Sequence, residues 1–146
     1  MCSISCAPTM LRIETKSRAR ALQILYAWEI QGAPPLPAVV SGLARLTGPE
    51  PRILDRAEAL ASDIVAEVGA LDAQAAGASE NWRMSRIAVV ERNILRLGVY
   101  ELRRGEVPPK VAINEAVHLA HWFGDLRAPG FINGVLDGVA RSMGRL

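Results

Sequence analysis

The sequence has few of the residues that disulfides, metal centres and nucleophilic catalysis require. Its two cysteines, Cys2 and Cys6, lie in the first ten residues, and nothing farther along has a C-x-x-C or H-x-x-x-H spacing. We therefore expect neither a disulfide framework nor a zinc site. Because Cys2 to Thr9 has no periodicity, residues 1–15 are expected to form a disordered leader, with Met10 as an alternative start.

Motifs for phosphate binding and for catalysis are also missing. The chain contains no G-x-x-x-x-G-K-[ST], no G-x-G-x-x-G and no G-x-S-x-G. Its 146 residues are enough for one domain with a real core, but not for a separate catalytic domain. We predict that the protein is not an enzyme and needs no cofactor.

Long apolar runs and a strong charge imbalance are absent too. No stretch approaches the roughly 20 apolar residues of a membrane-spanning helix, so we expect a soluble cytoplasmic protein without a membrane partner. The formal net charge is only +2. Any affinity for nucleic acid must therefore come from local clusters of basic residues.

What the sequence does contain is apolar residues at helical spacing, with no sustained two-residue alternation. Ser17 is a plausible N-cap of the first helix, and the segment 86–104 is apolar around so much of its circumference that it should be a central helix. An all-α fold follows. The expected helices cover residues 17–31, 36–46, 52–73, 86–104 and 109–124, and a last one follows Pro129 and Gly130.

The small-residue stretch from Ala75 to Ser79 is interpreted as a joint, because nothing in it is large enough to fill a core. Short loops between helices favour antiparallel packing. We therefore expect one domain over residues 16–146, built from an N-terminal bundle (16–77) and a C-terminal bundle (78–146).

One group of residues has the composition of a metal or acid–base site. Glu115, His118 and His121 are neighbours on the expected helix 109–124, beside Asn114 and Trp122. No second pair of ligands accompanies them, and such groups are more often a solvated helix face. We favour the surface interpretation and predict no metal.

Basic residues lead into the first helix, with two aromatic residues close behind: Arg12, Lys16, Arg18, Arg20, Tyr26 and Trp28. Lysine and arginine neutralise phosphates and exposed rings stack on unpaired bases, so the combination suits single-stranded RNA. Trp28, however, lies on the apolar stripe and is better explained by packing. A second arginine-rich stretch, 83–104, is typical of a solvated helix with ion pairs. Either cluster alone fits solubility as well as ligand binding.

Several long segments resemble one known family. The runs ILRLGVYELRRGEVPPK (94–110), VAINEAVHLAHWFG (111–124) and FINGVLDGVAR (131–141) are similar to the C-terminal half of NusB transcription antitermination factors, and RARALQILYAW (18–28) is similar to their first helix. The resemblance implies about seven helices in two stacked small bundles. It also implies an adaptor that binds the boxA element of nascent RNA together with NusE, a small-subunit ribosomal protein, so that the RNA polymerase elongation complex continues through ribosomal RNA operons.

The resemblance also implies roles for individual residues. Lys16 and Arg18 match RNA-contacting positions, and Phe123 and Phe131 match aromatic positions on the RNA-facing side, although a core role for either phenylalanine remains open. Tyr26 and Glu91 match positions of the NusE contact. From the basic cluster we add Arg20 to the RNA-binding set.

The segment DLRAPG (125–130) departs from the family, which usually has serine and lysine there. We expect Arg127 to compensate. Two other interpretations remain: a stand-alone domain related to the NusB-like domains of RNA cytosine methyltransferases, and a helical structural protein that associates with itself. A homodimer is compatible with each of them.

Overall fold

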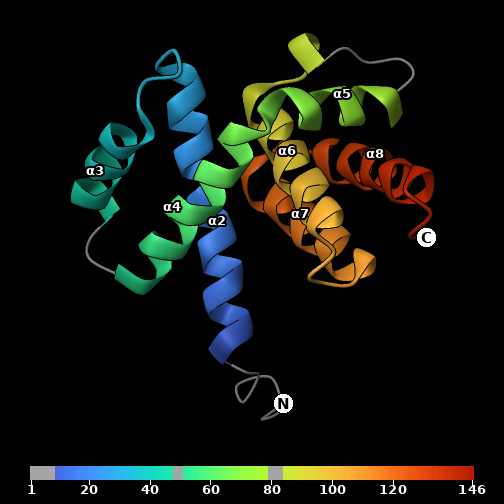
Figure 1. The fold of residues 1–146 in the computed structure, drawn as a ribbon, viewed down its shortest axis with the longest axis horizontal. Helices are drawn as coiled ribbons and strands as arrows, with labels where there is room; N and C mark the ends of the chain where they lie inside the picture. The colour runs from blue at the N-terminus through green and yellow to red at the C-terminus, as the bar shows by residue number, and fades with distance from the viewer. Residues whose placement is uncertain (1–8, 48–50, 79–83) are drawn as a thin grey trace. The chain divides into compact units, whose positions relative to one another are not determined.

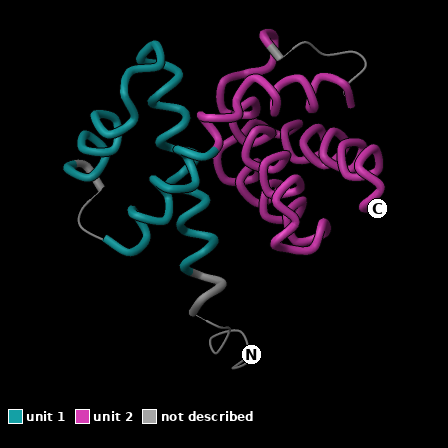
Figure 2. Tube along the Cα trace, in the orientation of Figure 1, with its two compact units in different colours: residues 1–63 teal, residues 64–146 magenta. Residues whose placement is uncertain are grey.

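The computed structural model describes residues 9–47, 51–78 and 84–146, and every regular element in these ranges is a helix (Figure 1). The predicted all-α class is therefore confirmed. The chain forms two compact units, residues 1–63 and residues 64–146 (Figure 2). Among the helices described here, none is long and apolar enough to cross a membrane.

The first unit is built from α2 (Thr9–Ile30), α3 (Leu36–Thr47) and most of α4 (Pro51–Ala66). α2 buries Ala21, Ile24 and Leu25, which are the apolar positions that the sequence pattern predicted. It ends where Gly32 and Ala33 take positive φ angles of 84° and 62°, and α3 then covers the expected second helix. The left-handed backbone explains the glycine at that turn.

The first helix starts earlier than predicted. α2 begins at Thr9, so residues 9–15 of the expected leader are helical, whereas residues 1–8 lie outside the described part of the chain. Ser17 is consequently inside the helix and is not its N-cap. Its hydroxyl donates to the Ile13 carbonyl at 2.7 Å, which is how a serine satisfies its polar atom within a helix.

The single long helix expected over residues 52–73 is two helices, α4 and α5 (Val68–Ala78). Glu67 separates the two helices, and its N–H donates to the Ile64 carbonyl three residues back at 3.1 Å. No proline marks this position. The nearest glycine, Gly69, lies inside α5, so neither residue type marks the break at Glu67 itself.

The stretch interpreted as a joint is largely the end of α5. Ala75 is buried, and a Cβ at Gly138 of α8 would lie 3.4 Å from the Ala78 Cβ. Small residues here allow two helices to approach closely, which is a packing role that their size alone does not reveal. α5 packs on α6 and α8, so it belongs to the second unit and the division lies at residues 63 and 64, earlier than expected. Ser79 lies outside the described residues.

The second unit continues with a short 3-10 turn, η1 (Met84–Arg86), and with α6 (Val89–Arg104), α7 (Pro109–Phe123) and α8 (Ala128–Ser142). α6 contacts α5, α7 and α8, and all its residues from Asn93 to Tyr100 are buried, as predicted for a central helix. It ends at Gly105, where φ is 70°, and Pro109 starts α7. Pro129 and Gly130 lie in the first turn of α8 and do not precede it.

A charged pair joins α5 to α6 inside this unit. Arg96 is only 7% exposed, and its guanidinium donates to both carboxylate oxygens of Asp72, at 2.7 and 2.8 Å. A third bond runs from Arg96 Nη1 to Asn93 Oδ1 at 3.0 Å. The buried arginine is therefore fully engaged, as a charge in a core must be.

Candidate functional site

The predicted RNA-contacting residues of the first unit lie on α2, and they differ in how far they reach solvent. Lys16 is exposed, and Arg20 follows one helical turn later, where its Nη1 donates to Gln23 Oε1 at 2.9 Å. Positions four apart share a helix face, so these two cations point the same way. Arg18 is 6% exposed and is engaged in the fold. Lys16 and Arg20 are thus the cations that can meet a phosphate without rearrangement.

Tyr26 lies on the solvent side of the same helix. It is 38% exposed, while its neighbours Ile24 and Leu25 are fully buried. Trp28 is half-buried, in keeping with its position at the edge of the apolar stripe. Tyr26 can therefore offer both a ring and a hydroxyl to a partner, and these are the features that make tyrosine common in protein interfaces.

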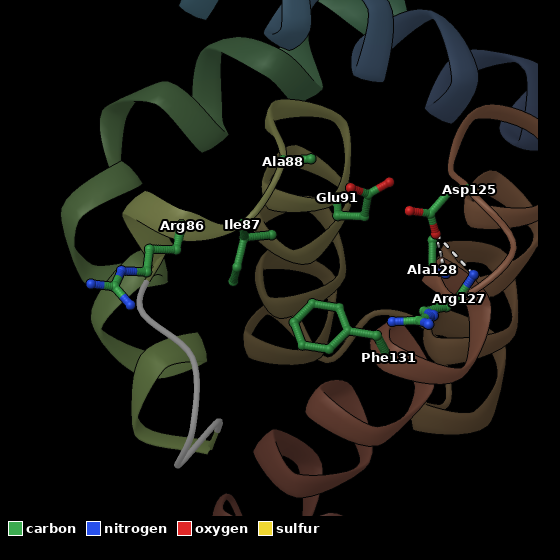
Figure 3. Close-up of a pocket in the computed structure, with 8 residues that line it drawn as sticks. All are labelled: Arg86, Ile87, Ala88, Glu91, Asp125, Arg127, Ala128 and Phe131. Carbon is green, nitrogen blue, oxygen red and sulfur yellow. Dashed lines mark hydrogen bonds between the residues drawn. The ribbon is translucent and has the colours of Figure 1, made fainter.

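The second unit contains an open pocket of about 290 Å³ in which several predicted site residues meet (Figure 3). It is lined by residues of η1, of the link from η1 to α6, of α6, and of the α7–α8 loop with the start of α8: Arg86, Ile87, Ala88, Glu91, Asp125, Arg127, Ala128 and Phe131. Glu91, Arg127 and Phe131 were predicted separately, for protein and for RNA contacts. The fold brings these three together around one cavity.

Glu91 occupies a tight position at this pocket. Burial, and next the negative charge of Asp125, raise the pKa of Glu91 above its ordinary value. A Cβ at Gly124 would lie 2.9 Å from Glu91 Oε2 and 2.6 Å from the Ala128 Cβ. The absence of a side chain at residue 124 is therefore what leaves room for the carboxylate.

Asp125 organises the loop that departs from the family pattern. Its Oδ1 accepts hydrogen bonds from the backbone N–H groups of Arg127 (2.8 Å) and Ala128 (3.0 Å), which are the dashed lines in Figure 3. A carboxylate that receives the free N–H groups at a helix start stabilises that start. Asp125 therefore fixes the loop, and the exposed Arg127 projects from it.

The two phenylalanines predicted to face RNA are not part of the buried core. Phe123, the last residue of α7, is 39% exposed. Phe131 is half-buried and lines the pocket. Both rings can therefore reach a ligand, Phe123 from an exposed position and Phe131 from a half-buried one, and their contact with RNA stays a prediction.

The Glu115, His118 and His121 group lies on α7, and its two histidines are exposed. In the ranges that the structure describes, no three His, Cys, Asp or Glu side chains are placed to hold a metal ion. His118 instead stacks on Trp122, with ring centroids 6.1 Å apart. The two histidines of this group therefore lie on the surface of α7, and Glu115 is half-buried.

Asp125, which lines the pocket, and Gly124, which leaves room for the Glu91 carboxylate, were not predicted as site residues from the sequence. Asp125 lies two residues before the N-cap of α8, Arg127, and aspartate commonly accepts hydrogen bonds from N–H groups two residues on in a turn, so its residue type was the one signal that could have identified it. The role of Gly124 depends on a contact with α6, more than thirty positions earlier in the chain, and has no local signal. Of the other predicted residues, Phe123 belongs to the second unit but does not line the pocket, whereas Lys16, Arg18, Arg20 and Tyr26 belong to the first unit.

Comparison with known proteins identifies the family. Residues 15–141 match the NusB family. The transcription antitermination protein NusB of Anaeromyxobacter sp. (strain Fw109-5) is 41% identical over 130 residues, which is 88% of this chain and 90% of that protein.

Solved structures agree with this match. The solution structure of NusB from Aquifex aeolicus is 26% identical with a TM-score of 0.79, over 90% of this chain and 89% of that one. A crystal structure of the antitermination factors NusB and NusE in complex with double-stranded RNA contains a chain that is 25% identical with a TM-score of 0.79, over 90% of this chain and 98% of that one. The sequence match over most of the chain and the shared helical fold show that this chain belongs to the NusB family.

Proposed function

We propose that this chain is a transcription antitermination adaptor that binds boxA RNA together with the ribosomal protein NusE. In this role it acts in the cytoplasm on the RNA polymerase elongation complex and supports transcription of ribosomal RNA, without catalysing a reaction itself. Family membership supports the antitermination role. The solved assembly of a similar chain with NusE and RNA supports both partners.

The observation that carries the protein partner is the pair of carboxylates in the pocket of the second unit. Glu91 and Asp125 repel each other, and no cation of the described residues forms an ion pair with either of them. The backbone N–H groups that donate to these carboxylates do not neutralise their charges, so the repulsion still disfavours the doubly ionised pair. A basic group on NusE would relieve this repulsion, so Glu91 is the residue we assign to the contact, together with the exposed Tyr26.

The RNA assignment rests on the cations and rings that reach solvent. Lys16, Arg20 and Arg127 supply charge for phosphates, and Phe123 and Phe131 supply rings for unpaired bases. Arg18, being buried, is assigned to the support of α2, with no direct phosphate contact.

The experiment that tests the proposal is capture of purified NusE by the tagged chain, with and without boxA RNA. We expect NusE to be retained, and to be retained more strongly with boxA RNA than with a scrambled RNA of equal length, because RNA that contacts both proteins couples the two binding events. Absence of NusE binding under both conditions would contradict the adaptor role. RNA binding without NusE binding would favour a stand-alone RNA-binding domain instead.

A further inference from the structure

The outward side of α7 carries a row of exposed residues that the proposed function has not used. Lys110, Asn114, His118 and Trp122 are four positions apart and all exposed, and we call them the α7 stripe. Residues at this spacing stack along one helix face. The stripe extends over about 18 Å, given the rise of about 1.5 Å per helical residue. It is thus long enough to contact several groups of one extended ligand.

Trp122 is the most unusual member. Trp122 is one of the large apolar residues that remain exposed to solvent in the fold, with 58% of the residue exposed. The His118 ring stacks on it at an interplanar angle of 18°. This contact covers part of the indole and restrains its orientation, while more than half of the residue remains open to solvent. A planar ring held in this way is a ready surface for stacking another planar group.

The polar residues around the ring favour a negatively charged ligand. Lys110 stands at one end of the stripe and the exposed His121 lies beside Trp122. The only carboxylate of α7, Glu115, lies off the stripe, is half-buried and is already engaged. The α7 stripe therefore presents a cation, an amide and two stacked rings, and no acid.

We propose that the α7 stripe binds single-stranded RNA, with an unpaired base stacked on Trp122 and a phosphate near Lys110. The inference rests on the proposed RNA-binding function and assigns it a further contact surface. A protein helix or groove would favour apolar side chains at successive turns, whereas three of the four stripe residues are polar. Proteins bind unpaired nucleic acid with cationic side chains that contact its phosphate backbone and aromatic side chains on which its bases stack.

The test measures binding of fluorescein-labelled single-stranded boxA RNA by anisotropy, in the presence of saturating NusE. Removal of one stacking ring typically weakens binding at least about fivefold, and we expect this loss for Trp122→Ala. Trp122→Phe, which keeps a ring, should retain most of the affinity. Lys110→Ala should reduce the slope of log K against log salt by about 0.7, the value for one phosphate contact on a single strand.

Ile30→Ala is the matched control, because Ile30 is an equally exposed apolar residue (60%) on α2, and it should bind RNA like the wild type. Circular dichroism confirms that each variant is folded. If the wild type binds RNA but Trp122→Ala binds it equally well, the stripe proposal is overturned and the proposed function stands. If the wild type itself fails to bind, both are overturned. Loss of NusE binding or of self-association by Trp122→Ala, with RNA binding unchanged, would assign the stripe to a protein partner and overturn the proposal.

Discussion

Glu91 combines an unfavourable environment for its charge with the NusE contact that we propose for it. Its carboxylate is partly withdrawn from water and lies near the charge of Asp125, so ionisation is disfavoured in the folded protein. Asp125 has its own task, because it receives two backbone N–H groups at the start of α8. The two acids therefore stay close for reasons that involve both the loop structure and the proposed contact with a basic partner.

The raised pKa of Glu91 predicts a pH-dependent stability. The folded protein holds this proton more tightly than the unfolded chain, so stability falls as the pH rises from about 4.5, the ordinary value, through the pKa in the folded state. Glu91→Gln removes the ionised form. We expect Glu91→Gln to melt at a higher temperature than the wild type at neutral pH, and at the same temperature near the ordinary pKa. Asp55→Asn, at an exposed position, is the control with an equal change of charge.

Gly124 gives a second prediction for a single residue. Its φ of −95° suits any residue, so the cost of Gly124→Ala is steric: the new Cβ would lie 2.6 Å from the Ala128 Cβ and 2.9 Å from the Ala120 carbonyl oxygen. Overpacking of this kind typically costs about 1–3 kcal/mol. We expect this loss in urea unfolding. Gly130→Ala has nothing within 4 Å of the new Cβ, and it should be neutral or slightly stabilising. Equal stability of both variants would contradict the close approach at Gly124.

Among the helices, the α5–α6 pair depends on a polar contact within an otherwise apolar interface. Asp72 is the acidic partner of the buried Arg96, and the side chain of Asp72 is 27% exposed. If Asp72 is removed, Arg96 keeps its charge in a buried position and loses two of its hydrogen bonds. The bond to the neutral Asn93 amide oxygen does not neutralise that charge.

Asp72→Ala is therefore expected to lower the free energy of unfolding by about 1.5–3 kcal/mol, the range for hydrogen bonds to charged groups. Chemical denaturation followed by circular dichroism measures it. Asp137 pairs with Arg141 on the surface of α8 at a similar distance of 2.8 Å, and Asp137→Ala serves as the control. We expect no measurable loss from that exposed pair. A large loss from both variants would show that burial is not the deciding factor.

Helices that end at residues with special backbone requirements were predictable. Gly32 and Gly105 adopt positive φ angles at the ends of α2 and α6, and Pro109 starts α7, because these residue types suit such positions for local reasons. The central position of α6 was predictable too, since apolar residues around the whole helix require partners on every side.

The sequence-based predictions of helix boundaries were wrong where tertiary packing overrides the local conformational preference of a residue. Ser17 has the composition of a cap but lies inside α2, and the break at Glu67 carries no breaker residue. The alanines at the end of α5 were interpreted as a linker, although their small size serves close helix contact. In the site, the exposure of Tyr26 and the burial of Arg18 depend on which face of α2 is covered. Residue type alone does not determine this.

For the whole molecule, we propose an adaptor in which the residues assigned to NusE and to RNA line one pocket in the second unit but occupy separate positions on α2 in the first unit. Tyr26, 38% exposed, is assigned to NusE, whereas Lys16 and Arg20 are assigned to phosphates. All three side chains come from α2 of the first unit. A charge placed at a desolvated protein contact weakens that contact strongly, while the loss of solvent-exposed cations weakens mainly salt-dependent RNA binding. Variants of one helix should therefore separate the two activities.

The most direct measurement compares NusE affinity and boxA RNA affinity for Tyr26→Asp and for the double variant Lys16→Ala, Arg20→Ala, with Tyr26→Phe as the control and circular dichroism to confirm folding. We predict that Tyr26→Asp weakens NusE binding at least about tenfold, or 1.4 kcal/mol, with a smaller effect on RNA. The double variant should keep its NusE affinity and lose about 1.4 from the salt slope of RNA binding, about 0.7 for each phosphate contact. Folded variants that bind both partners like the wild type, or that lose both equally, would contradict the assignment of separate α2 positions to NusE and to RNA.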